Sequence, residues 1–194
     1  MNENRNKRIK QKNNIIDTYI SDNSVGLEIG VFKGGFASHI LNRKKIKKLY
    51  LLDPWSVQVQ YPGRLYDGKR HNMSEVERNV RKSFGNMSNV EIIKDISTNV
   101  RKYIGENELD WVYVDGNHSY KFVLEDLENC RDLVKKNGYI MCDDYNWRGP
   151  NKNELGPKKA IHEFATKYNL EVILTGKEFN VLAEHIGASI KNIK

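Results

Sequence analysis

The sequence is poor in cysteine and proline, and it has no long apolar run. Two of its 194 residues are cysteines and four are prolines. Two thiols cannot build a disulfide framework, and neither Cys130 nor Cys142 stands in a Cys-x-x-Cys pair, so we expect both to be buried and reduced. No segment approaches the roughly 20 apolar residues that a membrane-spanning helix needs, and residues 1–20 lack the apolar stretch of a secretory signal. We therefore expect a cytoplasmic protein that does not enter membranes.

Charge is abundant, but the excess of positive charge is confined to two stretches. Residues 1–12 hold five Lys or Arg and one Glu, and Arg43–Lys48 hold five more basic residues, against a net charge of +7 for the whole chain. The remainder is therefore slightly acidic. A nucleic-acid-binding surface interleaves basic residues with aromatics across a fold. Here one stretch belongs to a basic N-terminal segment and helix, 1–24, and the other is expected to close a helix. We interpret both as solvated surface, which makes nucleic acid the weaker alternative as a partner.

Short apolar segments alternate with helical patterns along residues 25–194, which we predict to form a single domain. Strands are expected at 25–30, 49–52, 90–94, 110–115 and 139–142, and helices at 9–21, 36–48, 73–84, 97–104, 119–135 and 157–168. Strands that are apolar throughout and separated by helices predict an α/β fold with a mostly parallel sheet flanked by helices. Ligands of such sheets bind beyond the carboxyl ends of the strands.

The end of the chain predicts a reversed strand. Two apolar segments, 170–174 and 179–183, are separated by only four residues, whereas a parallel crossover needs a dozen or more. They are therefore expected to pair as an antiparallel C-terminal hairpin.

A further segment without a clear period, 55–72, is expected to form a loop over the site. Aromatic and basic residues expected near the carboxyl ends of the strands are candidates for contacts with an acceptor molecule. They are Trp55, Tyr61, Arg64, Tyr66, His71 and Trp147.

A glycine turn follows the first predicted strand and reads Glu28-Ile29-Gly30-Val31-Phe32-Lys33-Gly34-Gly35. Glycines at such a turn let a ligand approach the backbone closely. The dinucleotide fingerprint would need a glycine at Phe32, so a nicotinamide-dependent oxidoreductase is the weaker alternative. The pattern resembles instead the Glu-x-Gly-x-x-x-Gly motif of S-adenosylmethionine (SAM) enzymes. That resemblance implies that Glu28 helps to hold the methionyl amine of SAM, and that the loop with Gly30, Phe32 and Gly34 passes its ribose and amino-acid part.

Two acids follow the next two strands. Asp53 lies 23 residues after Gly30, where a carboxylate can accept hydrogen bonds from both ribose hydroxyls of an adenosyl group. Asp53 could equally stabilise the turn before Pro54. Asp95 and Ile96 match the position near the adenine ring in SAM enzymes, although Asp95 could also cap the helix that follows.

The richest set of functional groups lies between residues 109 and 147. One strand is expected to deliver Asp115, with His118 three residues later, and the next strand to deliver Asp143 and Asp144. The ends of neighbouring parallel strands lie roughly 4.8 Å apart, so the three carboxylates are expected to crowd together. Like charges at that spacing raise each other's pKa, so the cluster suits a cation. Oxygen ligands without cysteine favour Mg²⁺, Mn²⁺ or Ca²⁺ over zinc. The alternatives are an ordinary acidic turn and a structural role for His118.

On these residues, the chain from about Val25 to Ala183 resembles class I SAM-dependent methyltransferases. The Asp-Gly-Asn-His-Ser-Tyr turn and the later Asp-Asp-Tyr are similar to the metal-dependent sugar O-methyltransferases of the macrocin and mycinamicin type. The resemblance implies a Rossmann-like fold and Mg²⁺, or another divalent cation, bound by Asp115, Asp143 and Asp144. It also implies that His118 is the base and that Asp115 serves both the metal and the cofactor.

These inferences predict a SAM-dependent O-methyltransferase. The sulfonium of SAM is an activated donor, so the protein has to align an acceptor oxygen and remove its proton. A divalent cation stabilises the developing alkoxide, and a histidine with a pKa of about 6.5 can take the proton. The expected acceptor is a hydroxyl of a small sugar-like or phenolic molecule. A homo-oligomer is left open. A nucleic-acid methyltransferase is disfavoured because the sequence has no Asn-Pro-Pro-Tyr motif.

Overall fold

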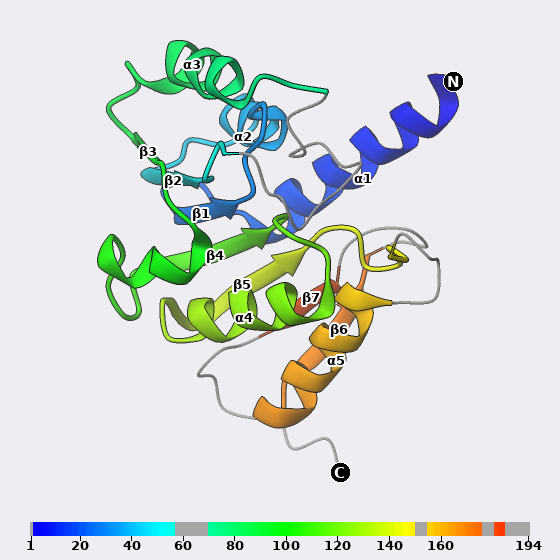
Figure 1. The fold of residues 1–194 in the computed structure, drawn as a ribbon. Helices are drawn as coiled ribbons and strands as arrows, with labels where there is room; N and C mark the ends of the chain where they lie inside the picture. The colour runs from blue at the N-terminus through cyan, green and yellow to red at the C-terminus, as the bar shows by residue number, and fades with distance from the viewer. Residues whose placement is uncertain (1, 57–69, 150–154, 176–180, 185–194) are drawn as a thin grey trace.

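The protein is described by a computed structural model that covers residues 2–56, 70–149, 155–175 and 181–184. Its centre is a seven-stranded sheet with the order β3-β2-β1-β4-β5-β7-β6 (Figure 1). The strands are β1 Val25–Ile29, β2 Lys48–Leu52, β3 Val90–Ile93, β4 Leu109–Val114, β5 Val134–Cys142, β6 Glu171–Leu174 and β7 Val181–Glu184. The first five pair in parallel, and β7 is antiparallel to both β5 and β6. The predicted mostly parallel sheet is therefore confirmed.

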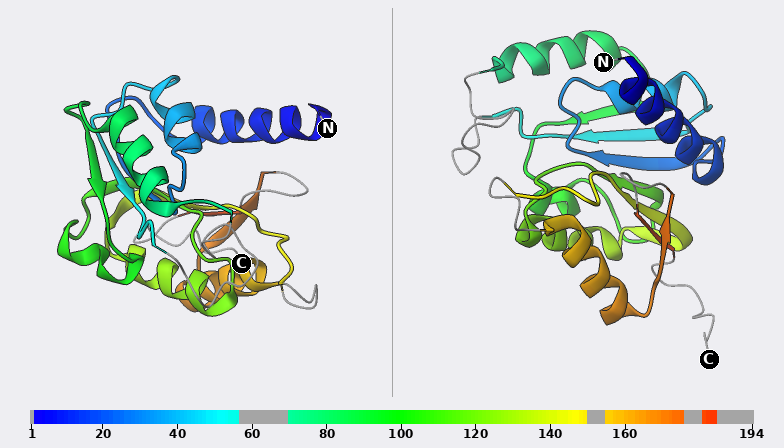
Figure 2. Two further views of the ribbon diagram at one scale, coloured as in Figure 1. Left: turned by 45° about the horizontal axis from the view of Figure 1, so that its top comes forward. Right: turned by 90° about the vertical axis from the view of Figure 1, so that its right-hand side faces the viewer.

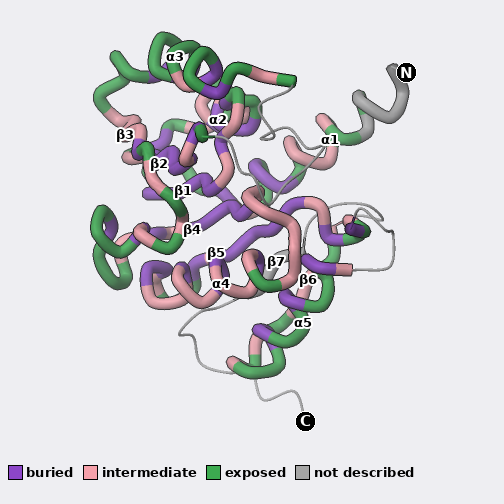
Figure 3. Tube along the Cα trace, in the orientation of Figure 1, coloured by how far each residue is buried: buried purple, intermediate pink, exposed green. Residues whose placement is uncertain are grey.

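Helices cover both faces of the sheet (Figures 1 and 2). They are α1 Asn2–Tyr19, α2 Gly35–Leu41, α3 Met73–Phe84, the 3-10 helix η1 Ser97–Lys102, α4 Tyr120–Arg131 and α5 Gly156–Tyr168. Alternation along β4 explains the two layers, because neighbouring residues of a strand point to opposite faces. Trp111 and Tyr113 pack with α1, α2 and α3, whereas Val112 and Val114 pack with α4 and α5. The central strands are accordingly buried (Figure 3).

Helix α2 is much shorter than the sequence pattern predicted. The expected helix 36–48 ends at Leu41, and the N–H of Asn42 closes its last turn on the carbonyls of Ser38 and Ile40. The basic run that follows is held in a loop instead of a helix, since the Lys45 N–H donates to Asp22 Oδ1 at 2.7 Å. The interpretation of Arg43–Lys48 as the end of a helix is therefore wrong. Residues 43–47 form the loop that leads into β2, which begins at Lys48.

The boundary between α4 and β5 also differs from the expectation. Helix α4 ends at Arg131 instead of residue 135, and β5 begins at Val134 instead of residue 139, ahead of the Asn137-Gly138 pair. Asn137 has a φ of 69°, and a Cβ on Gly138 would lie 2.7 Å from the carbonyl oxygen of Asp110. The pair therefore forms an irregularity in the pairing of β4 with β5.

The two cysteines are buried and not in a disulfide, as expected. Among the described helices, none is both long and apolar enough to cross a membrane.

Candidate active site

The acidic residues singled out from the sequence gather at the carboxyl ends of three neighbouring strands. Ile29 of β1 pairs with Val114 of β4, and Val114 pairs with Cys142 of β5. Asp115 and Asp143 come directly after the last two of these residues, so the parallel register places them side by side. The expected convergence of residues far apart in the sequence is what the fold produces.

Asp115, His118 and Asp144 form one cluster that is open to solvent. His118 Nε2 lies 3.3 Å from Asp144 Oδ2 and 4.0 Å from Asp115 Oδ1. One possible ligand atom from each residue lies within 4.8 Å of the others. Asp144 has a φ of 51°, and this left-handed turn directs the chain back over the strand ends. Each of the three side chains is between a fifth and a third exposed, so an ion or an acceptor could reach them.

Asp143 has a different environment from its neighbour Asp144. Its side chain is 1% exposed, and Oδ2 accepts a hydrogen bond from the Tyr113 hydroxyl at 2.7 Å and lies 2.8 Å from the ammonium of Lys12. Oδ1 accepts from the N–H of Asp144. Burial would raise the pKa of Asp143, but the positive charge of Lys12 and these hydrogen bonds outweigh it and lower the pKa. The role of Asp143 as a metal ligand stays a prediction, and in this structure both of its oxygens already have partners.

Lys12 of α1 also reaches this acidic site, and the sequence analysis did not single it out. Its ammonium lies 3.8 Å from Asp115 Oδ2 as well as 2.8 Å from Asp143, and 5.3 Å from the centre of the Phe36 ring. Desolvation lowers the pKa of Lys12, but Asp143 and Asp115 outweigh it and raise the pKa overall. A signal was present in the sequence, because Lys12 lies three residues after Ile9 and four before Ile16. It therefore falls on the apolar face of the predicted helix, where a lysine needs a buried partner.

The glycine turn is a tight left-handed turn that packs against the backbone following β4. Gly30 has a φ of 87°, and a Cβ there would lie 2.2 Å from the carbonyl oxygen of Asp115. Phe32 and Gly34 also have positive φ, 49° and 73°. Glu28 is buried below this turn, and its Oε2 has no hydrogen-bond partner within the described parts of the chain. Burial raises the pKa of Glu28 to about 8. A buried acid with an unused oxygen fits a ligand that brings a cationic group, such as the amine of SAM.

Asp53 supports the glycine turn from below. It is fully buried, and it accepts hydrogen bonds from the N–H of Phe32 at 2.9 Å and of Trp55 at 2.7 Å. The stabilising role in the turn, which the sequence left open, is therefore present, while ribose binding stays a prediction. Trp55 is 2% exposed and donates from Nε1 to the Phe32 carbonyl. Its ring therefore packs in the core and does not face an acceptor.

Beyond β3, Asp95 accepts hydrogen bonds from the N–H of Ile96, from Asn99 and from the Tyr103 hydroxyl, and these bonds lower its pKa. Its local structural role is thus present. Ile96 is 49% exposed, and its contact with adenine stays a prediction.

Of the aromatic candidates for acceptor contacts, Trp147 lies against the cluster, with its ring centre 5.7 Å from that of His118. The ring of His71 meets Phe32 edge to face at 5.1 Å. Tyr61, Arg64 and Tyr66 lie outside the described residues.

Taken as donor sets, these residues fit the two groups that the sequence implied. The carboxylate oxygens of Asp115 and Asp144 are donors of the kind that Mg²⁺ and Mn²⁺ take, and Glu28 with the Gly30 turn suits SAM. Strand order, glycine turn and acidic mouth together define a class I SAM-dependent methyltransferase domain.

Comparison with known proteins agrees with this class. The model of a methyltransferase domain family matches residues 27–145, and the chain belongs to that family. The chain is 32% identical over 136 residues to protein R132 of Acanthamoeba polyphaga mimivirus, covering 68% of this chain and 56% of that protein. It therefore spans about half the length of this curated relative. The family assignment removes the nicotinamide-dependent oxidoreductase as an alternative.

Solved structures show the same fold at low sequence identity. The O-methyltransferase NovP superposes with a TM-score of 0.64 at 20% identity, over 92% of this chain and 79% of NovP. Fibrillarin of Aeropyrum pernix, with natively bound S-adenosyl-L-methionine, superposes with a TM-score of 0.58 at 16% identity, over 84% of this chain and 67% of fibrillarin.

Proposed function

We propose that the protein transfers the methyl group of SAM to a hydroxyl oxygen of a small sugar-like or phenolic acceptor, with the help of a divalent cation. The observation that carries this proposal is the cluster of Asp115, His118 and Asp144, whose ligand atoms lie within 4.8 Å of one another beside the glycine turn. Nitrogen and oxygen donors that converge this closely can bind a cation and move a proton.

The side chains would divide the work as follows. Asp115 and Asp144 would hold the cation, which is sufficient for Mg²⁺, since this ion is commonly bound through one or two carboxylates and waters. When bound, SAM supplies the activated methyl group and the cation supplies a Lewis acid for the acceptor oxygen. His118 would accept the hydroxyl proton, and Asp144, whose Oδ2 lies 3.3 Å from Nε2, would stabilise the imidazolium that results.

The cofactor would lie over the glycine turn. Glu28 would pair with the methionyl amine, Gly30 and Gly34 would let the backbone pass close to the ligand, and Phe32 would flank it. Asp53 would bind the ribose hydroxyls, and Asp95 with Ile96 would border the adenine ring. We place the acceptor above the cluster near Trp147. Within this proposal, residues 25–194 form the catalytic domain and residues 1–24 an added segment and helix, and nucleic acid is not the acceptor.

The proposal is tested by following methyl transfer from labelled SAM to a panel of sugars and catechols, with Mg²⁺ or Mn²⁺ and then with EDTA. Transfer that needs a divalent cation is expected. EDTA-resistant turnover would remove the cation from the mechanism, and transfer to RNA or DNA but to no small hydroxyl would contradict the acceptor class.

Two variants separate the roles within the cluster, with Asp132→Asn, whose side chain is 42% exposed, as the control. Asp144→Asn should weaken Mn²⁺ binding, measured by the electron paramagnetic resonance (EPR) signal of free Mn²⁺. His118→Gln should retain Mn²⁺ binding and lower kcat by about 100-fold or more, the usual size of a general-base contribution. If His118→Gln loses Mn²⁺ affinity instead, His118 is a ligand and not the base.

A further inference from the structure

Helix α1 brings two positive charges to the acidic mouth. Lys12 Nζ lies 2.8 Å from Asp143 and 3.8 Å from Asp115, and Arg8, one helical turn earlier, lies 3.4 Å from Asp144. Residues four apart share a face of a helix, so both side chains reach the cluster together.

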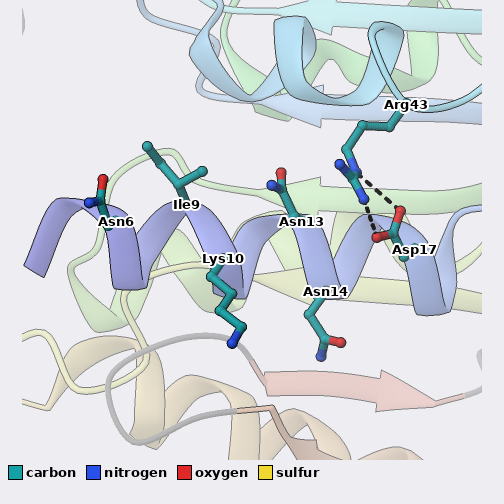
Figure 4. Close-up of a pocket in the computed structure, with 7 residues that line it drawn as sticks. All are labelled: Asn6, Ile9, Lys10, Asn13, Asn14, Asp17 and Arg43. Atoms are coloured by element: carbon teal, nitrogen blue, oxygen red, sulfur yellow. Dashed lines mark hydrogen bonds and ion pairs between the residues drawn. The ribbon is translucent and has the colours of Figure 1, made fainter. Parts of the chain in front are cut away.

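The C-terminal half of α1 packs against the remainder of the protein. This half buries Ile15 and Ile16 completely, and Asp17 pairs with Arg43 beyond the end of α2 (Figure 4). These contacts fix the half of the helix that follows Lys12. The residues drawn in Figure 4 line a pocket along α1, and Asp17 is the one acidic residue among them.

The ammonium of Lys12 and a divalent cation would compete for the same carboxylates. An ion held by Asp115 and Asp144 would lie near Nζ, which is 3.8 Å from Asp115 Oδ2, and like charges repel at short range. Lys12 is the side chain with the least freedom to avoid this repulsion, since it is four-fifths buried. Arg8 is about half exposed and can turn into solvent.

We propose that Lys12 is a positioning residue that sets the affinity of the site for its divalent cation, by acting as an internal counter-ion of Asp143 and Asp115. This inference rests on the proposed function. The positive charges of α1 repel the cation. Binding of the ion therefore weakens the pairing of Lys12 with Asp143, and this pairing weakens binding of the ion to the same extent. Lys12 also explains how four buried or half-buried carboxylates, including Glu28, are tolerated in one mouth of the sheet.

The test is Mn²⁺ binding measured by EPR on the full chain, compared between wild type and Lys12→Met. The substitution should tighten Mn²⁺ binding at least tenfold, and Lys12→Arg, which keeps the charge, should restore weak binding. Lys10→Met is the matched control, because Lys10 lies on the same helix, is exposed, and points away from Arg43 (Figure 4). It should leave the affinity unchanged. Lys12→Gln provides a second neutral variant if Lys12→Met does not fold.

A second measurement tests the same coupling by following the chemical reactivity of Lys12. Acetylation of Lys12 by acetic anhydride, followed by mass spectrometry, should become faster when Mn²⁺ is present, whereas acetylation of Lys10 should not change. Equal or weaker Mn²⁺ affinity in Lys12→Met would overturn the proposal. Absence of Mn²⁺ binding in every variant would also overturn it, together with the cation part of the proposed function. Methyl transfer, assayed separately with EDTA, shows whether the catalytic proposal itself survives.

Discussion

The ammonium of Lys12 lies 2.8 Å from Oδ2 of Asp143, and this ion pair joins the first helix to the end of β5. Together with the contact of Arg8 to Asp144, it brings a segment outside the central sheet to the candidate active site. Its partners extend the link, since Asp143 also accepts from Tyr113. The same pair makes a prediction about stability that does not depend on the reaction.

Removing Lys12 should destabilise the protein because it leaves the buried carboxylate of Asp143 without its counter-ion. We expect Lys12→Met to cost about 2 to 4 kcal/mol of unfolding free energy, somewhat less than a fully buried pair. Lys12→Met combined with Asp143→Asn should cost less than the sum of the single changes, by about 1 to 3 kcal/mol. Urea unfolding measures these values. Lys167→Met breaks a comparable 2.9 Å contact to Glu128 at the surface and should cost no more than about 1 kcal/mol. Additive effects of the Lys12 and Asp143 changes would contradict the buried pair.

The glycine turn gives a second prediction, and its control is Gly35, five residues further along at the start of α2. Gly30→Ala places a Cβ 2.2 Å from the Asp115 carbonyl oxygen and forces alanine into a φ of 87°. We expect it to destabilise the protein by more than about 2 kcal/mol and to abolish binding of S-adenosylhomocysteine, measured by calorimetry. Gly34 is not a suitable control, because it also has positive φ. Gly35 is suitable, because nothing lies within 4 Å of a Cβ at this position. Gly35→Ala should therefore leave both quantities near wild type, and a tolerated Gly30→Ala would show that the turn is looser than described.

Glu28 gives a prediction about pH. Its pKa rises from 4.5 to about 8 on burial, so between these values the folded protein holds a proton that the unfolded chain has released. Unfolding then releases a proton, and rising pH favours unfolding until the pH passes about 8. Relative to Glu28→Gln, the unfolding free energy of the wild type should fall by up to about 1.4 kcal/mol for each pH unit in this window.

This pH dependence is measured by urea unfolding at pH 5, 6, 7 and 8. The same substitution at the exposed Glu106 controls for the loss of one acidic side chain. Parallel stability curves for wild type and Glu28→Gln would mean that Glu28 is ionised in the folded protein at neutral pH.

The arrangement at the strand ends could be predicted because it depends on local signals that add up. Apolar strands between helices fix a parallel sheet, and in such a sheet residues that follow adjacent strands meet, as Asp115 and Asp143 do. The Gly30 turn was readable for the same reason, since a positive φ and a close approach both need glycine.

Features that depend on pairing across the whole chain could not be read in this way. The pairing of Lys12 with Asp143 joins a helix at the start of the chain to a strand near its end, and no local pattern specifies it. Asn137-Gly138 is a usual helix stop, yet here it serves an irregular strand pairing. The run Arg43–Lys48 has good helix formers, but tertiary contacts of Lys45 with the loop before β1 decide its conformation.

The most direct test of the account is a nuclear magnetic resonance measurement on SAM labelled with ¹³C in its methyl group. With the wild-type protein, Mn²⁺ should broaden the resonance of the bound methyl group strongly, while Mg²⁺ should not, and Asp144→Asn should restore a sharp line. These results would place the cation beside the group that is transferred. A sharp methyl resonance from bound SAM at saturating Mn²⁺ would contradict the central claim.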